Sequence, residues 1–189
     1  MQVLKEEVRE RILAAAVQVF YEKDFRSAKM QDIAKLADVS ASLLYSYFEN
    51  KEKLFEGVVS SVPFDFDRIA REEESILEGT PSERFQIAAE GPLLDMLAHH
   101  KLLVILVDKS QGTAYEHTKD DFVESIERHI RCMVNERAPL RYPDLLAHVL
   151  ASNFVESLME VARHYSSKSE ARDMLALIAQ CYYEGVNSL

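Results

Sequence analysis

The sequence holds 189 residues with only five glycines and five prolines, and 48% of its residues are hydrophobic. A chain of this length can bury about two-thirds of the surface that its unfolded form exposes, so it needs no disulfide or metal to hold a core. Its formal net charge of −10 argues against a general nucleic-acid binder, which is usually strongly basic. The whole negative excess follows residue 55, because residues 1–55 hold nine basic and nine acidic side chains. The N-terminal quarter is therefore the part best suited to an anionic partner.

Targeting signals and cysteines point to the cytoplasm. The first residues, MQVLKEEVRERIL, are charged and amphipathic, so we expect no signal peptide there. The longest apolar run, LLVILV at 102–107, is too short to span a bilayer. Cys132 and Cys181 lie in helical windows without metal-ligand spacing, which favours free thiols in a reducing compartment. We therefore expect a cytoplasmic protein with no membrane segment.

Apolar spacing and capping residues predict an all-α chain. Its first helices are expected at 4–21, 28–37 and 41–48, and a fourth begins at residue 51 and ends or kinks at Pro63. Ser27, Ser40 and Asn50 are the expected N-caps of the second, third and fourth helices. Capping boxes at Thr80 and Ser167 begin later helices. The predicted later helices cover 82–90, 92–110, 119–136, 143–165 and 168–186.

The first three helices have the lengths and the short connecting turn of a helix-turn-helix unit, in which the third helix enters the major groove of DNA. Spacing alone leaves open the alternative of three core helices of any bundle. The window MQDIAKLADVSASLLYSYFENKEKLF closely resembles the DNA-binding domain of the tetracycline-repressor (TetR/AcrR) family. Its Asp-Ile-Ala, Val-Ser, Leu-Tyr-x-Tyr-Phe and Lys-Glu-x-Leu elements carry the resemblance, which covers about a quarter of the chain.

The resemblance implies a DNA-binding surface on the second and third helices. It places the start of the second helix beside the DNA backbone, the start of the third in the groove, and Tyr45, Tyr47 and Lys51 at phosphates, although core packing stays an alternative for both tyrosines. Lys51 also lies at a helix N-terminus, where backbone N–H groups favour an anion. The full implied set is Lys29, Met30, Gln31, Ser40, Ala41, Ser42, Leu43, Tyr45, Tyr47 and Lys51.

The chain departs from the family pattern at several positions. Asp24 and Asp38 stand where glycine is common, and Ala28-Lys29 replaces Thr-Thr. Ala41 and Ser42 replace longer or basic residues, so neither position offers an Arg or Asn for bidentate contacts to bases. We therefore expect sequence readout through thymine methyl groups, water bridges or DNA shape.

The family resemblance further implies a helix-turn-helix domain at 1–50 and an effector-binding and dimerisation domain at 51–189. The last two helices would pair with those of a second copy, although a monomeric core would show similar apolar stripes. Those stripes consist of Leu146, Val149, Leu150, Phe154 and Leu158, and of Met174, Leu177, Ile178, Cys181 and Tyr182.

An effector pocket is expected among the middle helices, from apolar residues with polar interruptions. Asn153 falls on an apolar stripe, where a satisfied core amide is an equally good interpretation. His99, His100 and His117 lack metal-ligand spacing, so we expect no metal, no cofactor and no catalytic site. The candidate pocket residues are Phe64, Phe66, Leu97, His100, Tyr115, Phe122 and Asn153.

Together these inferences predict a ligand-responsive DNA-binding regulator. It would act as a repressor that binds a pseudo-palindromic double-stranded DNA operator as a homodimer and is released by a small-molecule effector. A helical adaptor that has lost DNA binding is the main alternative, given the modest basic charge of residues 1–55. A helical enzyme or metal carrier is a third, although the sequence shows no convergent carboxylates and histidines at metal spacing.

Overall fold

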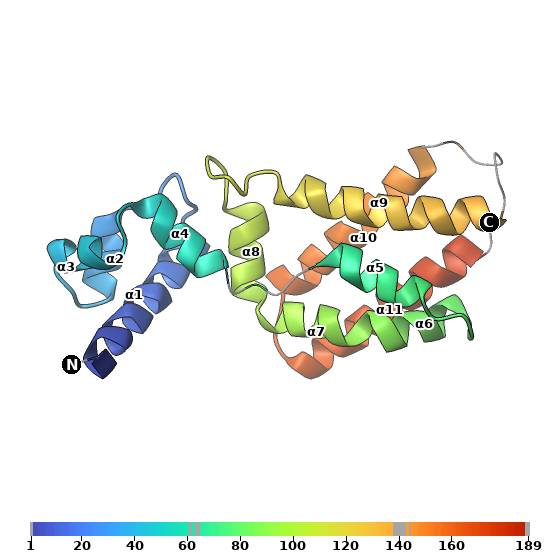
Figure 1. The fold of residues 1–189 in the computed structure, drawn as a ribbon, viewed down its shortest axis with the longest axis horizontal. Coiled ribbons are helices and arrows are strands. Elements are labelled where there is room, and N and C mark those ends of the chain that lie inside the picture. Colours follow the sequence, from blue (N-terminus) through green and yellow to red (C-terminus); the bar gives the residue numbers. More distant parts are fainter. Residues whose placement is uncertain (1, 61, 63–64, 138–142, 144, 188–189) are drawn as a thin grey trace. The chain divides into compact units, whose positions relative to one another are not determined.

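The computed structural model describes residues 2–60, 62, 65–137, 143 and 145–187, and within these ranges it holds eleven helices and no strand (Figure 1). The all-α prediction is confirmed. The helices are α1 (Gln2–Glu22), α2 (Met30–Leu36), α3 (Ala41–Tyr47), α4 (Lys51–Val59), α5 (Phe66–Glu74), α6 (Pro81–Ala88), α7 (Glu90–Ala98), α8 (His100–Asp108), α9 (Thr118–Arg137), α10 (Leu145–Arg163) and α11 (Lys168–Asn187).

The chain folds into two compact units. The first contains the described residues up to Val62 together with Lys101–His117, and the second contains the remaining described residues up to His100 and from Thr118 onward. The first unit thus includes α4 and nearly all of α8 as well as α1 to α3, whereas the sequence suggested a division after residue 50.

The core of the first unit forms around α1, because its apolar residues recur every three or four positions on one face. Ile12, Ala16 and Phe20 are fully buried there. The Phe20 and Phe55 rings meet edge to face with 5.1 Å between centroids, and α2 and α4 both pack on α1. This arrangement holds α3, which packs on α2, at the surface of the unit.

The structure confirms two of the three N-caps that the sequence predicts in this unit. The Ser40 hydroxyl accepts a hydrogen bond from the Leu43 N–H at 3.1 Å, and the Asn50 side chain accepts one from the Lys53 N–H at 2.8 Å. The cap expected at Ser27 is wrong, because α2 begins only at Met30 with Lys29 before it. The Ser27 N–H instead donates to the Asp24 carboxylate at 2.6 Å.

Both aspartates that replace family glycines adopt a backbone conformation that favours glycine. Asp24 has a φ of 125° and Asp38 a φ of 52°. A side chain at positive φ is strained, although aspartate tolerates the left-handed region better than most residues. The two turns that flank α2 therefore have a positive φ at an aspartate, the kind of conformation for which glycine is the usual residue.

In the second unit α9 packs along α10 and α5, and α11 packs on α7 and α10 (Figure 1). The sequence missed α5, which the Asp65 side chain caps by accepting from the Arg68 N–H at 2.9 Å. The helix expected at 92–110 is interrupted at His99, so it forms α7 and α8. The capping box at Thr80 is confirmed, and Ser167 caps α11 by accepting from the Glu170 N–H at 3.1 Å.

Helix α10 is long and apolar enough to cross a membrane by length and composition. However, 44% of its apolar window is buried inside the protein, and core helices of soluble proteins often pass the same test. Since α10 packs on α7, α9 and α11, the fold explains the buried part of its apolar surface.

Candidate nucleic-acid interface and ligand cavity

Helix α3 separates a buried side from an exposed one. Leu44 is fully buried and Phe48, just after the helix, is 6% exposed, so these residues anchor α3 to the core. Ala41 and Ser42 are exposed, Leu43 is 39% exposed and Tyr45 is 51% exposed. The first turn of α3 thus presents small and apolar groups with one phenol beside them.

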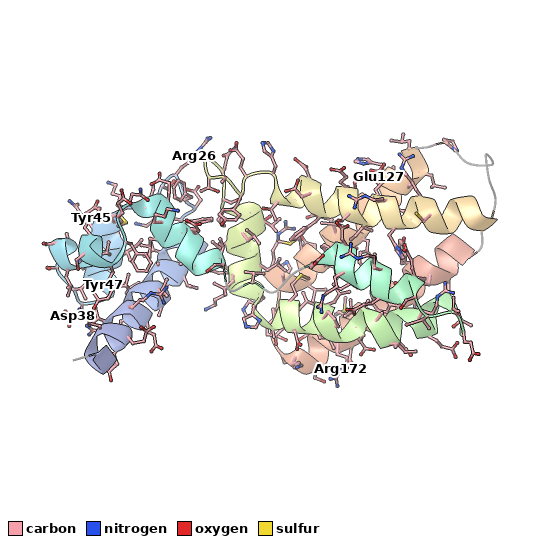
Figure 2. All side chains as sticks on the ribbon, viewed as in Figure 1. Arg26, Asp38, Tyr45, Tyr47, Glu127 and Arg172 are labelled. Carbon is pink, nitrogen blue, oxygen red and sulfur yellow. The ribbon has the colours of Figure 1, made fainter. Side chains whose placement is uncertain are left out.

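Tyr45 and Tyr47 differ in their surroundings. Tyr45 is the more exposed of the two, whereas Tyr47 is half-buried at the end of α3, so the core-packing alternative fits Tyr47 better (Figure 2). Ser40 is exposed, but its hydroxyl already caps α3. Ser40 would therefore contribute to a DNA surface by fixing the orientation of the turn formed by Ala41–Leu43.

The start of α2 places only two of three expected residues at the surface. Lys29 and Gln31 are exposed, but Met30 is 8% exposed and belongs to the core with Ile33 and Ala34. The expectation that Met30 faces DNA is therefore corrected. The helical period causes the difference, because Met30 shares the inward stripe of Ile33 and Ala34. Leu36, which the sequence did not single out, is 47% exposed on the same helix.

Lys51 does not have the solvated ammonium that a phosphate contact needs. Its Nζ donates to the backbone oxygens of Phe25 at 2.7 Å and Ala28 at 3.0 Å, and it lies 4.4 Å from the centre of the Phe25 ring. The side chain therefore binds the loop between α1 and α2 to the start of α4. The phosphate role expected for Lys51 is replaced by one in shaping the first unit.

The segment after α8 packs on this same loop. The Phe25 N–H donates to the Lys109 carbonyl oxygen at 2.9 Å, and the rings of Phe55 and Tyr115 lie 6.1 Å apart. Tyr115 therefore belongs to the unit that carries α3, and its expected place in an effector pocket is corrected. Residues 109–117 are thus part of the support for α2 and α4.

A small cavity lies in the second unit between α5, α6, α7, α9, α10 and α11, with a volume of about 50 Å³. Apolar and aromatic side chains dominate its wall, and Glu73, Ser125, His129 and the Tyr182 and Tyr183 hydroxyls supply its polar groups. Its lining residues are Phe66, Ile69, Ala70, Glu73, Phe85, Ala89, Leu93, Ser125, Ile126, His129, Phe154, Tyr182 and Tyr183.

Glu73 is the buried charge of this cavity, at 4% exposure. The Tyr183 hydroxyl donates to its two carboxylate oxygens at 2.9 and 3.0 Å. The His129 Nε2 lies 3.6 Å from Glu73, and its Nδ1 lies 3.0 Å from Glu74. Burial acts to lower the pKa of His129, but the hydrogen bonds and charges of the two carboxylates outweigh it and raise that pKa. Burial and the nearby Glu73 raise the pKa of Tyr183, so its hydroxyl stays protonated and donates.

The candidate pocket residues are scattered over several environments. Phe66 lines the cavity. The Phe122 ring packs edge to face on the Phe66 ring, with 5.0 Å between their centroids. Leu97 is fully buried in the packed core of α7, and His100 stacks on Tyr165 at 4.3 Å. Neither Leu97 nor His100 is among the described residues that line the cavity.

Two further candidates fall elsewhere. Asn153 is exposed and lines open grooves beside α10, so the core-amide interpretation is corrected. Phe64 lies outside the described residues.

Sequence reasoning missed Glu73, His129 and Tyr183. Glu73 stands in the charged run REEES, which the sequence did not single out, although its i+4 spacing from the buried Ile69 places it on the inner face of α5. Among the described residues, no group of three His, Cys, Asp or Glu side chains is placed to hold a metal ion.

Helices α10 and α11 also expose an apolar stripe. Leu145 is 65% exposed and Val149 is 43% exposed on α10, and Met174 and Leu177 are 42% and 56% exposed on α11. Cys181, one helical turn beyond Leu177, is exposed as well. These residues lie within the helices that the sequence suggested for dimer contacts.

Comparisons with known proteins agree with the helix-turn-helix geometry. The family model described as bacterial regulatory proteins, tetR family, matches residues 12–58. The HTH-type transcriptional regulator TtgR of Pseudomonas putida is 34% identical over 76 residues, which cover 40% of this chain and only 36% of TtgR. The HTH-type transcriptional repressor BepR of Brucella suis biovar 1 is 26% identical over 180 residues, which cover 91% of this chain and 77% of BepR.

A solved structure shows the same fold over nearly the whole chain. It is a TetR-like transcriptional regulator from a Rhodococcus species, with a TM-score of 0.62 and 22% identity over 94% of this chain and 96% of the other. The helices of residues 12–58 thus have the helix-turn-helix arrangement that the tetR family model describes. Residues 12–58 are therefore similar to the tetR family, and nearly the whole chain shares the fold of a TetR-like regulator.

Proposed function

We propose that this protein is a cytoplasmic transcriptional repressor that binds a pseudo-palindromic operator as a homodimer and is released by a small-molecule effector. The observation that carries the proposal is the exposed first turn of α3, held by the Ser40 cap within the region that matches the tetR family model. A capped helix with a buried rear face and an exposed first turn suits entry into a major groove.

In this proposal the residues of the surface divide into two groups. Ala41, Ser42 and Leu43 contact base edges, and their lack of charge favours thymine methyl groups, water-mediated contacts and DNA shape. Lys29, Gln31 and Tyr45 contact phosphates, which fix the register of the protein on the duplex. Lys51 acts indirectly, because it holds the loop before α2 in place.

A second copy of the chain covers the apolar stripe on α10 and α11. Leu145, Val149, Met174 and Leu177 form an exposed set that a symmetric contact would bury. Dimerisation places two recognition helices at half-sites about 34 Å apart, one helical turn of DNA. This spacing explains why a dimer would prefer a pseudo-palindrome.

The two cysteines provide a test of this interface. Cys181 lies on the stripe of α11 and Cys132 lies on α9, and both are exposed in the single chain. In the proposed dimer, Cys181 reacts with iodoacetamide more slowly than Cys132 does, and dilution to the monomer brings the two rates together. Equal rates at a concentration where sedimentation shows a dimer contradict an interface through α11.

Effector control follows as a shift in population. A ligand that binds the second unit would favour dimers whose recognition helices no longer match adjacent grooves, with a coupling of about 1–3 kcal/mol. The chain enters the first unit again at Lys101, and residues 109–117 then contact the loop before α2. Helices α4 and α8 are therefore the elements through which we expect the signal to pass.

Recovery of bound DNA from the native genome tests the proposed function. Tagged full-length protein, mixed with sheared genomic DNA at low salt and washed with rising salt, should enrich a few fragments that contain an inverted repeat. A helical adaptor without DNA binding would enrich none, and that result would overturn the repressor proposal.

A further inference from the structure

The cavity of the second unit holds a carboxylate whose hydrogen bonds are incomplete. Glu73 is 4% exposed, and the single Tyr183 hydroxyl proton is shared between its two oxygens at 2.9 and 3.0 Å. A carboxylate offers about four acceptor positions, so the Tyr183 hydroxyl and the His129 Nε2, which lies 3.6 Å away, leave some of them open. A buried charge is costly unless it is paired and hydrogen-bonded.

A second polar group of the same cavity lacks a partner. Tyr182 lines the cavity, and its hydroxyl is buried without a hydrogen bond among the described residues. Its ring packs edge to face on Tyr183 at 5.2 Å, and burial together with the charge of Glu73 raises the pKa of the Tyr182 hydroxyl, so this group lies within the field of the buried carboxylate. The cavity can therefore receive a polar group from outside the protein.

The remaining wall is aromatic. The Phe85 ring lies 5.5 Å from Tyr183, the Phe154 ring 5.2 Å from Tyr182, and Phe66 closes another side of the cavity. Aromatic faces attract cations through their quadrupole, and the attraction grows when water is excluded. A buried carboxylate within aromatic walls is thus complementary to an organic cation.

The other charged groups near Glu73 are compatible with this ligand. His129 on α9 lies 3.6 Å from Glu73 and also contacts Glu74, its neighbour on α5, at 3.0 Å. A ligand cation can therefore replace His129 at Glu73 while His129 keeps Glu74. Arg84 on α6 acts on Tyr183 electrostatically but is not among the described residues that line the cavity.

We propose that this cavity is the effector site and that its ligand is a compact aromatic amine, whose ammonium group pairs with Glu73. The inference rests on the proposed function, because it names the class of effector. An anionic ligand would be repelled by Glu73, and a neutral ligand would form a weaker hydrogen bond to the carboxylate than an ammonium group does. Since the cavity volume is about 50 Å³, far below the roughly 300 Å³ at which ligand pockets begin, the aromatic walls must move apart on binding.

Isothermal titration of the full-length protein tests the ligand class. The probes are benzylamine, 2-phenylethylamine and 3-phenylpropylamine, each compared with the alcohol and the carboxylate that share its ring and chain length. At least one amine should bind about tenfold more tightly than its alcohol and its carboxylate, as a charge-assisted hydrogen bond provides. If no amine binds, or if an alcohol or carboxylate binds equally well, the proposal is overturned.

Variants locate the amine. Glu73→Gln should remove the preference for the amine over its alcohol, whereas the matched control Glu74→Gln, which alters a half-exposed carboxylate beside the same histidine, should keep it. Ala70→Leu fills the cavity and leaves both carboxylates intact, so it should abolish amine binding even if Glu73→Gln does not fold. Unchanged binding in Ala70→Leu, or an amine preference that survives in folded Glu73→Gln, would place the amine elsewhere.

The test of the amine ligand can be distinguished from the test of DNA binding. Retention of promoter DNA by the wild-type protein without any amine tests the repressor proposal alone. Wild-type protein that retains DNA but shows no amine preference overturns the ligand class and leaves DNA binding intact.

Discussion

The ammonium group of Lys51 lies 2.7 Å from the carbonyl oxygen of Phe25 and 4.4 Å from the centre of the Phe25 ring. A lysine at the start of α4 thus holds the loop that precedes α2. Because the same loop donates a hydrogen bond from the Phe25 N–H to the Lys109 carbonyl oxygen, it joins three parts of the first unit.

Lys51→Met should destabilise the first unit by about 1–3 kcal/mol, because the carbonyl oxygens of Phe25 and Ala28 lose a charged donor. Urea denaturation followed by circular dichroism measures the change. Lys53→Met is the matched control, since Lys53 pairs with Glu56 at the surface, and it should leave the midpoint unchanged. Equal midpoints for the two variants would contradict the role given to Lys51.

Asp38→Gly should stabilise the protein and Asp38→Ala should destabilise it, each by about 0.5–1 kcal/mol. The reason is the φ of 52° at Asp38, which glycine adopts without strain and alanine does not. Thermal denaturation of the two variants provides the comparison. A more stable alanine variant would show that the turn before α3 does not hold this conformation.

His129 should make stability depend on pH. Its folded pKa is raised, so the stabilisation is complete below the unfolded pKa of about 6.5 and is lost as pH rises through the folded value. The titratable groups that face His129 are Glu73 and Glu74 on α5, together with the two tyrosines of α11 that line the same cavity. His129→Gln should flatten the slope of unfolding free energy against pH above about 6.5. The exposed control His164→Gln should keep it, and a slope that persists in His129→Gln would assign it to another group.

Two substitutions on α3 should have different effects on DNA binding. Ser42→Ala should alter the preference among operator variants, because the proposed function places the exposed Ser42 on the turn that faces bases. Tyr45→Phe should weaken binding to all sequences alike, since it removes a phosphate donor. Competition assays with single-base operator variants measure both, and identical profiles would contradict the division of roles.

Lys29→Ala should reduce the slope of log affinity against log salt by about 0.9, the value for one phosphate contact. The control is Lys168→Ala, which changes an exposed lysine near Asp95 in the second unit and should leave the slope unchanged. Fluorescence titrations at several salt concentrations determine the slopes. A slope in Lys29→Ala equal to that of the wild type would remove Lys29 from the phosphate contacts.

Leu177→Glu should convert the dimer to a monomer and reduce operator affinity at least about tenfold, because it places a charge within an apolar contact. Leu77→Glu makes the same change at a side chain that is 93% exposed and outside the stripe, so the dimer should persist. Analytical ultracentrifugation distinguishes the two. A dimeric Leu177→Glu protein would contradict the proposed interface.

Features that depend on neighbours in sequence were predictable. The caps at Ser40, Asn50 and Thr80 follow from a polar side chain placed three residues before an N–H group, and the structure confirms all three. The inward positions of Leu44 and Phe48 follow from the helical period. The exposed turn of α3 was therefore available from the sequence.

Features that depend on tertiary contacts could not be predicted from the sequence. The partners of Lys51 are 26 and 23 residues away in the chain, and Glu73 meets Tyr183 across 110 residues. No local pattern shows that a lysine at a helix N-terminus will bind carbonyl groups, or that one glutamate of an acidic run will be buried. The residues that line the cavity were harder to predict than the exposed turn of α3 for this reason.

Fluorescence anisotropy with a labelled promoter fragment at two salt concentrations tests the central claim most directly. If α3 recognises DNA, the wild-type protein should bind saturably, about a thousandfold more tightly than it binds a scrambled fragment, and the binding should weaken as salt rises. The same recognition predicts that Leu43→Asp, which places a carboxylate in the groove, abolishes the binding without unfolding the protein. Equal affinity for promoter and scrambled DNA, or unchanged binding by Leu43→Asp, would contradict DNA recognition by α3.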